Sequence, residues 1–337
     1  MRKGVNPEKD KKLDSYGYHR IIVPIYVPNL EGYFEHGLAV TKLCISSLLA
    51  TKHEKSLLTI VNNGSCMEVS DFLQQLYKTG KIDQLVHYKN NVGKIDAMIP
   101  IARTSQEPLI TLSDGDVLFT SEWMQAVEEI FLNIPKAGMV APVPNPTLYR
   151  AHTENTLFDG FFSRSLKFQS VCSEEDLLRF AESVGSEESM YRKKSRLHSQ
   201  LTIEKNGVTA VVGCGHFVAT LRKEVFEKAP KTGSQWAYAA AADRDYIDLP
   251  NDRAGFWRLA TPKSYAFHIG NQIEPWMHKV ASNNDDGIVA SSQQIPPPKR
   301  SSIGYGVKKA INRLWLNQYT RPFFFKRMGL KRGYDEY

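Results

Sequence analysis

The sequence predicts an α/β protein with a mostly parallel sheet flanked by helices, and three observations support this. Apolar runs of strand length alternate with segments of helical periodicity across residues 20–144, a pattern typical of βαβ units. Hydrophobic residues make up 42% and charged residues 23% of the 337 residues, which is enough to build a core. No apolar run approaches the roughly 18 residues that a membrane-spanning helix needs.

The predicted elements follow one another in order along the first half of the chain. Ser70 is the expected N-cap of the second helix, Gly80 follows its end, and Pro100 is expected to kink or shorten the third helix. Strands are predicted at 20–28, 57–65, 82–88, 108–114 and 137–144, and helices at 38–51, 70–80, 94–105 and 121–134.

The pattern weakens between 145 and about 205, where the stretch 173–196 is typical of one or two exposed helices. The stretch 208–230 then predicts a strand, a turn and a helix. These changes predict a polar arm at 1–19, one domain at 20–280 with halves at 20–118 and 119–280, and a linker with a basic aromatic tail at 281–337.

Charge and cysteine content limit the function classes. The net charge of +7 indicates either an anionic partner or simply a solvated basic surface. The four cysteines form no CxxC pair, which argues against a zinc ribbon and a disulfide framework. The first twenty residues contain no apolar core of a signal peptide, so we expect a cytoplasmic protein.

The strand predicted at 108–114 runs directly into the triplet Asp114-Gly115-Asp116. Ligands of parallel α/β sheets bind at the carboxyl ends of the strands. Two carboxylates at such an end suit Mg²⁺ or Mn²⁺ together with substrate phosphates, and the glycine lets a ligand approach the backbone. The alternative is an ordinary turn, because Asp-Gly is a common turn dipeptide.

Three segments resemble the inverting family 2 glycosyltransferases of the GT-A fold. They are RIIVPIYVPN, TIVNNGS and NNVGKIDAMIPIARTSQEPLITLSDGD. The resemblance covers 20–150 well and 208–271 more loosely. It implies a GT-A fold, with a Rossmann-like sheet, a smaller acceptor-side subregion and a C-terminal helical tail.

The resemblance also implies a nucleotide-sugar site. Asn62 or Asn63 stands where the family has an aspartate, but an amide can still pair with the edge of a base. The alternative for Lys94 is a solvated lysine at a helix start. The implied residues line the base pocket, the diphosphate side and the ribose, and they are Pro24, Tyr26, Asn63, Asn91, Gly93, Lys94, Asp114 and Gly115.

A metal site is implied next to the donor. Asp114 and Asp116 would hold Mn²⁺ or Mg²⁺ at the diphosphate, and His268 would complete the set of ligands. A lone histidine on an apolar face can equally be a structural residue, so both interpretations of His268 stay open.

A second acidic cluster is implied to supply the general base that takes the proton of the acceptor hydroxyl. The candidates are Asp243 and then Asp245, with Asp248 a weaker third. Arg244 interrupts the acidic pair of the family. The alternative is that these acids cap a helix or pair with Arg244 and Arg253.

The predicted function is therefore metal-dependent, inverting transfer of a sugar from a UDP-, GDP- or dTDP-sugar to a hydroxyl acceptor. The acceptor is expected to be a glycan or lipid-linked, in surface polysaccharide synthesis. No P-loop is present, and nucleic acid is not expected as a partner. Two alternatives are a sugar-phosphate nucleotidyltransferase and a non-catalytic module that binds a sugar nucleotide or a glycan.

The C-terminal tail places Trp315, Phe323, Phe324 and Phe325 among lysines and arginines. This composition suits peripheral contact with the inner face of a membrane. It also suits a helix that docks on the catalytic domain, and the sequence does not choose between the two.

Overall fold

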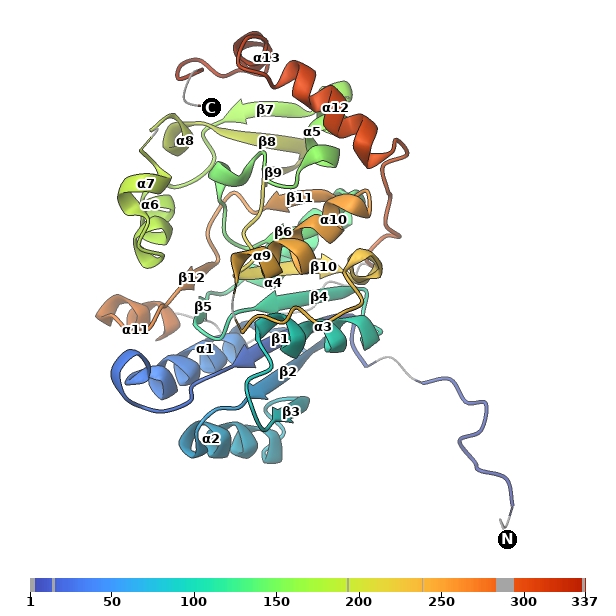
Figure 1. The fold of residues 1–337 in the computed structure, drawn as a ribbon, viewed down its shortest axis with the longest axis vertical. Helices are drawn as coiled ribbons and strands as arrows, with labels where there is room; N and C mark the ends of the chain where they lie inside the picture. The colour runs from blue at the N-terminus through green and yellow to red at the C-terminus, as the bar shows by residue number, and fades with distance from the viewer. Residues whose placement is uncertain (1–3, 14–15, 193, 238, 283–293, 335–336) are drawn as a thin grey trace.

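The computed structural model describes residues 4–13, 16–192, 194–237, 239–282, 294–334 and 337. A ten-stranded sheet in the order β3-β2-β1-β4-β10-β6-β11-β9-β8-β7 runs through the whole molecule (Figure 1). The strands β3, β2, β1 and β4 are parallel, whereas the rest of the sheet is mixed. The predicted α/β architecture is confirmed.

The first half of the chain alternates strands and helices. Its elements are β1 (His19–Ile25), η1 (Gly32–Phe34), α1 (Gly37–Thr51), β2 (Ser56–Asn63), α2 (Met67–Lys78), β3 (Gln84–Tyr88), α3 (Lys94–Thr104), β4 (Leu109–Ser113), β5 (Val117–Phe119), α4 (Trp123–Asn133) and β6 (Ala137–Ala141).

The second half is less regular. Its elements are η2 (Pro146–Leu148), α5 (Glu154–Phe162), β7 (Leu166–Gln169), α6 (Glu174–Ser183), α7 (Glu187–Met190), α8 (Ser195–His198), β8 (Gln200–Lys205), β9 (Val208–Val212), β10 (Val218–Arg222), η3 (Lys223–Lys228), α9 (Ala240–Asp243), η4 (Arg244–Asp248), α10 (Leu249–Arg253), β11 (Trp257–Ala260), β12 (Ala266–His268), α11 (Pro275–Ser282), α12 (Tyr305–Trp315) and α13 (Arg321–Arg327).

Two details of the sequence interpretation are wrong. Ser70 is not the N-cap of α2, because the helix begins at Met67, and the Ser70 hydroxyl instead donates to the carbonyl of Ser65. The helix expected up to residue 230 is the strand β10 followed by a 3-10 helix. Pro100 lies inside α3, which continues to Thr104, so the proline does not shorten this helix.

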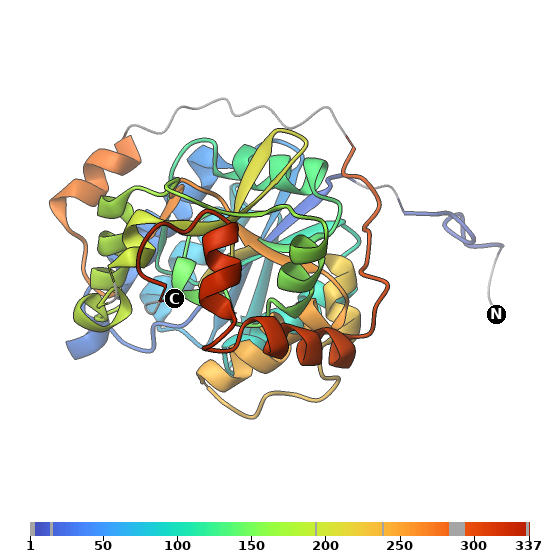
Figure 2. The same ribbon diagram turned by 90° about the horizontal axis from the view of Figure 1, so that it is seen from above.

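Alternating side chains of β1 place the sheet between two helical layers. Ile21 and Val23 face the cluster that contains buried residues of α1 and α2, whereas Ile22 faces the cluster that contains α3 and η4. Successive residues of a strand point to opposite faces, so one strand contributes to both cores. Figure 2 gives the same layers from above. The site described below lies where the carboxyl ends of β1 and β4 emerge from these layers.

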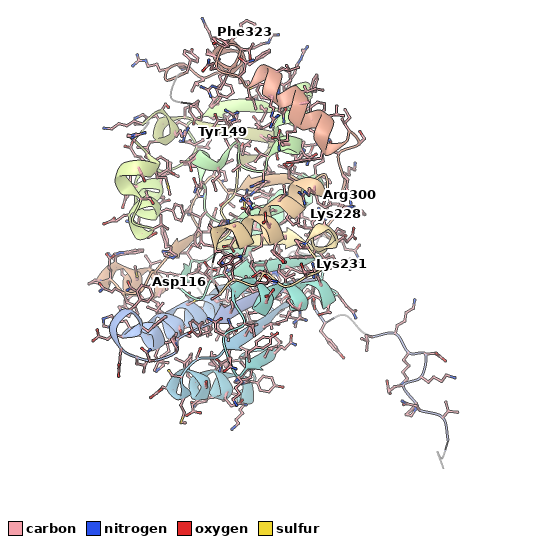
Figure 3. All side chains as sticks on the ribbon, viewed as in Figure 1. Asp116, Tyr149, Lys228, Lys231, Arg300 and Phe323 are labelled. Atoms are coloured by element: carbon pink, nitrogen blue, oxygen red, sulfur yellow. The ribbon has the colours of Figure 1, made fainter. Side chains whose placement is uncertain are left out.

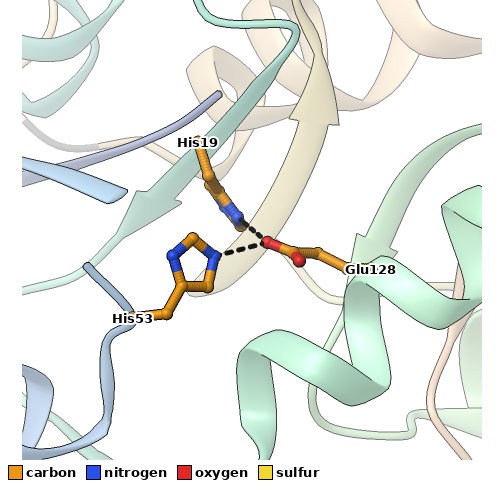
Figure 4. A group of neighbouring side chains, drawn as sticks. All are labelled: His19, His53 and Glu128. Atoms are coloured by element: carbon orange, nitrogen blue, oxygen red, sulfur yellow. Dashed lines mark hydrogen bonds and ion pairs between the residues drawn. The ribbon is translucent and has the colours of Figure 1, made fainter. Parts of the chain in front are cut away.

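A buried hydrogen-bond network joins β1, the loop after α1, and α4 (Figure 4). His19 Nδ1 and His53 Nε2 lie 2.7 and 3.0 Å from Glu128 Oε1, and the Tyr18 hydroxyl donates to Glu128 Oε2. His19 Nε2 lies 2.7 Å from the hydroxyl of Thr111. Burial would raise the pKa of Glu128, but hydrogen bonds from both histidines outweigh it and lower the pKa to about 2. A charged carboxylate thus holds three elements together.

We predict that Glu128→Ala lowers the free energy of unfolding by about 3–5 kcal/mol, because two buried histidines and the partly buried Tyr18 hydroxyl lose their acceptor. The depressed pKa of Glu128 contributes to the free energy of unfolding of the wild-type protein. This contribution is fully present above pH 4.5 and is lost as the pH falls toward 2. Burial also lowers the pKa of His19, so this histidine likewise makes the folded protein less stable as the pH falls. Urea unfolding at pH values on both sides of 4.5 measures this slope. An unchanged slope in Glu128→Gln would contradict the assignment.

The C-terminal helices pack on the far end of the sheet (Figure 1). Trp315 and Phe325 are buried in the cluster that contains β7, β8 and β9, and Trp315 stacks on Phe161 with ring centroids 4.5 Å apart. Phe323, by contrast, is 64% exposed. Two aromatic residues of the tail, Trp315 and Phe325, are therefore docked on the rest of the protein. In the part of the chain that is described, no helix has both the length and the apolar character to cross a bilayer.

Candidate active site

A pocket of about 270 Å³ opens at the carboxyl ends of β1 and β4. Figure 3 labels Asp116 at this position. Gly93 is not among the residues that line the pocket, but it is the N-cap of α3. The other residues that the sequence predicts for the donor site all line it, together with Asp116: Pro24, Tyr26, Asn63, Asn91, Lys94, Asp114 and Gly115.

A turn between β4 and β5 brings both acids of the triplet to the pocket. Asp114 follows the end of β4, Gly115 and Asp116 form the turn before β5, and all three residues line the pocket. A Cβ on Gly115 would lie 2.7 Å from Ile25 Cδ1 and 3.0 Å from the carbonyl oxygen of Pro24. Only glycine therefore lets this turn lie against the end of β1.

Lys94 connects the two acidic clusters that the sequence separates by more than a hundred residues. Its Nζ atom lies 2.6 Å from Asp114 Oδ1 and 3.2 Å from Asp243 Oδ1. Burial would lower the pKa of Lys94, but the two carboxylates outweigh it and raise the pKa. Burial raises the pKa of Asp114, with Lys94 opposing and Asp116 adding to the shift. The site thus holds an ammonium between two carboxylates.

His268 lies next to Asp116 because β12 pairs antiparallel with β5. This register sets His268 opposite Val117, and the amide of Ile269 donates to the carbonyl of Asp116. His268 Nε2 lies 3.3 Å from Asp116 Oδ2. The other carboxylate oxygen, Asp116 Oδ1, is buried and has no hydrogen-bond partner among the described residues.

The chemistry of these side chains suits a divalent cation, but their ligand atoms are not gathered into one compact group. Among the described residues, only His19, His53 and Glu128 place three possible ligand atoms within 4.8 Å of one another, and none of these three lines the pocket. Two carboxylates and an imidazole are ligands that Mn²⁺ accepts, and Mg²⁺ accepts the carboxylates. The buried and unpartnered oxygen of Asp116 is the kind of atom that a cation satisfies. Asp114, Asp116 and His268 are the residues that could hold the ion.

Two asparagines fix the loop before α3. Asn63 Nδ2 donates to Asn91 Oδ1 at 2.9 Å, and Asn63 Oδ1 accepts from the amide of Val92. Asn91 Oδ1 also accepts from the amide of Gly93, whose φ of +90° favours glycine. Asn62 instead donates to the hydroxyl of Ser70, away from the pocket lining. Of the neighbours Asn62 and Asn63, it is thus Asn63 that lines the pocket.

Asp243 and Asp245 are not brought together. Both lie on the continuous helical segment α9–η4–α10. Each helical residue turns by about 100° from the one before, so residues two apart point to nearly opposite sides of the helix. Asp243 has a buried side chain directed at Lys94. Asp245 pairs with Arg244 at 2.8 Å and lines a separate hollow that Arg253 also lines.

His216 and Asp248 extend the site beyond Asp243. His216 Nε2 lies 3.9 Å from Asp243 Oδ2, and its Nδ1 lies 3.2 Å from Asp248 Oδ2. Asp248 Oδ1 in turn accepts from Arg258 at 2.8 Å. Burial would lower the pKa of His216, but the hydrogen bond with Asp248 raises it. The sequence interpretation did not include His216 among the site residues. Its only signal was a glycine-rich stretch before β10.

Aromatic residues that the sequence interpretation also left out border the pocket on the side of β1. Tyr33 and Phe34 line it beside Tyr26, and the Tyr26 and Phe34 rings meet edge to face with centroids 6.0 Å apart. The signal in the sequence was a pair of aromatic residues in the loop after the first strand.

Two solved structures are similar to parts of this chain. One is the mannosyltransferase PcManGT from Pyrobaculum calidifontis in complex with GDP-Man and Mn²⁺, with 14% identity, 92% of this chain and 72% of that chain covered, and a TM-score of 0.43. The other is TarS 1–349 from S. aureus in complex with UDP-GlcNAc, with 13% identity, 36% and 33% covered, and a TM-score of 0.29. Scores this low transfer no ligand or residue role. Curated protein sequences gave no match.

The sequence model described as glycosyl transferase family 2 matches residues 33–227. The match contains β1's carboxyl-side loop, α1 to β10, and the triplet at the pocket. It covers more than half of the chain. The chain therefore belongs to glycosyl transferase family 2 and is a glycosyltransferase.

Proposed function

We propose that the enzyme transfers a sugar from a nucleotide-diphosphate sugar to a hydroxyl acceptor, with inversion and with a divalent cation. The observation that carries this proposal is the position of Lys94, which lines the pocket with Asp114 and also pairs with the buried Asp243. Membership of a glycosyltransferase family argues against the nucleotidyltransferase and against a non-catalytic module.

Donor binding follows from the pocket lining. The rings of Tyr26, Tyr33 and Phe34 offer flat apolar surfaces for a nucleobase. Lys94 at the first turn of α3 offers a positive charge to the diphosphate, and the N-terminal end of the helix adds to it. When bound by Asp114, Asp116 and His268, Mn²⁺ or Mg²⁺ would neutralise charge on the diphosphate.

Asp243 is the proposed general base. Its side chain is 2% exposed and does not line the pocket itself, but it pairs with Lys94, which does. From behind Lys94 it would accept the proton of an acceptor hydroxyl while that oxygen attacks the anomeric carbon. His216 approaches the same carboxylate, and its raised pKa favours the cation that stabilises the charged base. One displacement of this kind inverts the anomeric carbon and needs no covalent enzyme intermediate.

The finer assignments remain proposals from the sequence. We propose a UDP-, GDP- or dTDP-sugar as donor, a glycan or lipid-linked acceptor in surface polysaccharide synthesis, and a cytoplasmic location. The domain limits 20–118 and 119–280 are likewise proposed as the donor and acceptor halves.

A thermal-shift screen of UDP-, GDP- and dTDP-sugars, each with and without Mn²⁺, tests the proposal. We expect one donor family to raise the melting temperature only when the metal is present, because diphosphate and cation bind to each other as well as to the pocket. Radiolabelled transfer to water or to a glycan then checks turnover. Absence of a metal-linked shift with every donor would contradict the proposed function.

A further inference from the structure

The end of the molecule where α5, β7 and α13 meet carries exposed aromatic rings beside cations. A hollow there has a volume of about 530 Å³. Phe162 and Phe323 on its rim are 59% and 64% exposed. In Figure 3 Phe323 points outward at this end of the molecule, far from Asp116. We call this surface the basic–aromatic face and define it by Phe162, Arg164, Lys167, Phe323 and Arg327, which all line the hollow.

The exposed rings are held by partly buried ones. Phe162 contacts Phe161, Phe161 contacts Phe324 and Phe324 contacts Phe323, with ring centroids 5.3, 5.2 and 5.3 Å apart. Phe161 also stacks on the buried Trp315. The two outer rings are therefore presented on a packed base, and their exposure is a built feature of the fold. Large exposed aromatic groups with such support indicate a binding surface.

The cations of this face have few acidic partners. Lys167 pairs with Glu204 at 3.0 Å, but Arg164 and Arg327 have no carboxylate within 4.0 Å in the described part of the chain. The stretch 305–337 contains two acidic residues, Asp335 and Glu336, and eight basic ones. Lys308 is buried near Asp159 and does not add to the surface charge. The other seven basic residues are Lys309, Arg313, Arg321, Lys326, Arg327, Lys331 and Arg332. An excess of this kind attracts an anionic surface.

We propose that the basic–aromatic face binds the surface of an anionic lipid membrane. Phe162 and Phe323 would enter the interface between headgroups and acyl chains, and Arg164 and Arg327 would lie against lipid phosphates. A membrane fits this face better than a protein partner, because aromatic tips among cations without neighbouring acids match an interface that is apolar inside and negative outside. Figure 1 places the face at the opposite end from β1, β2 and β3, so docking would leave the donor-binding half in solution.

Cosedimentation of the full chain with phosphatidylcholine vesicles, with and without phosphatidylglycerol, tests the proposal. We expect strong binding only to the anionic vesicles, weakened by added salt. Phe162→Ser with Phe323→Ser should lower the partition coefficient about tenfold or more. Arg164→Gln with Arg327→Gln should lower it about 25-fold, since each cation near such a surface contributes about fivefold.

Matched controls lie on α2, at the other end of the sheet. Met67→Ser removes an exposed apolar side chain, and Lys78→Gln with Lys81→Gln removes two exposed charges. Both should leave vesicle binding within about twofold of the wild type. Thermal unfolding of every variant checks the fold, and the single changes Phe323→Ser and Arg327→Gln replace any double variant that is unstable.

Three results would overturn the proposal. The first is equal binding to neutral and anionic vesicles, and the second is an equal loss in the α2 controls. The third is a difference in oligomeric state between the face variants and the wild type on gel filtration without lipid. Such a difference would identify the face as a contact between copies of the chain. The assay contains no nucleotide sugar, so it stands or falls independently of the proposed function.

Discussion

Asp116→Ala is expected to abolish metal-linked donor binding and to lower kcat/KM by about a thousand-fold or more. The substitution removes the carboxylate that lies 3.3 Å from His268 and that carries a buried oxygen without a hydrogen-bond partner among the described residues. A bound cation contributes several kcal/mol of charge stabilisation to the departing diphosphate, and this would be lost. Isothermal titration with the donor, with and without Mn²⁺, measures the first effect, and initial rates measure the second.

The stability of the variant separates a metal ligand from a structural acid. Asp116 makes one described ion pair, with a histidine that is itself partly exposed, so its loss should change the melting temperature of the metal-free protein little. Asp71→Ala is a matched control, because Asp71 is an exposed acid on α2. If Asp116→Ala bound donor and Mn²⁺ as tightly as the wild type, the acids around Gly115 would not be the metal site.

The sequence predicted that most of the proposed donor-site residues share one pocket, because local patterns place them at the same edge of the sheet. Buried strands are continuous apolar runs, and in a βαβ array their carboxyl ends meet at one edge of the sheet. Asp114, Asn63 and Lys94 each follow such a strand or begin the next helix, so their meeting at one pocket is a consequence of the topology.

The positions of Asp243, Asp245 and His216 were less predictable because they depend on helical phase and on distant contacts. The sequence ranked Asp243 before Asp245, but only the helical segment through 240–253 shows that they point in different directions. Pro250 has no amide to donate and would clash with a preceding carbonyl, which is consistent with the widened π-helical turn before it. His216 joins the site only through contacts with residues 27 and 32 positions away.

The strands β7 and β8 were missed for a different reason. They pair at one edge of the sheet, where Lys167 and Glu204 face solvent and interrupt the apolar pattern. Edge strands are protected from aggregation by such charges, which makes them resemble loops in the sequence. The burial of Leu166, Phe168 and Leu201 comes from packing against α13 and other distant elements.

Asp243→Asn is expected to lower kcat by about 10² to 10⁴-fold while donor affinity changes far less. The amide cannot take the proton of the acceptor hydroxyl, whereas the pocket lining and the metal ligands stay in place. Donor dissociation constants from titration and single-turnover rates with acceptor separate the two steps. Loss of one carboxylate next to Lys94 leaves Asp114 as its partner at 2.6 Å, so the ammonium keeps a counter-charge.

Asp245→Asn supplies the comparison, because the two acids are two residues apart in the same helical segment and differ in direction. Asp245 is paired with Arg244 in the hollow that Arg253 also lines, so its replacement should leave kcat within about twofold of the wild type. Equal losses in both variants would mean that the helical segment, and not one carboxylate, carries the effect. A large loss in Asp245→Asn alone would transfer the role of base to a residue that faces away from Lys94, and the pocket at Asp114 would then not be the place where the acceptor is deprotonated.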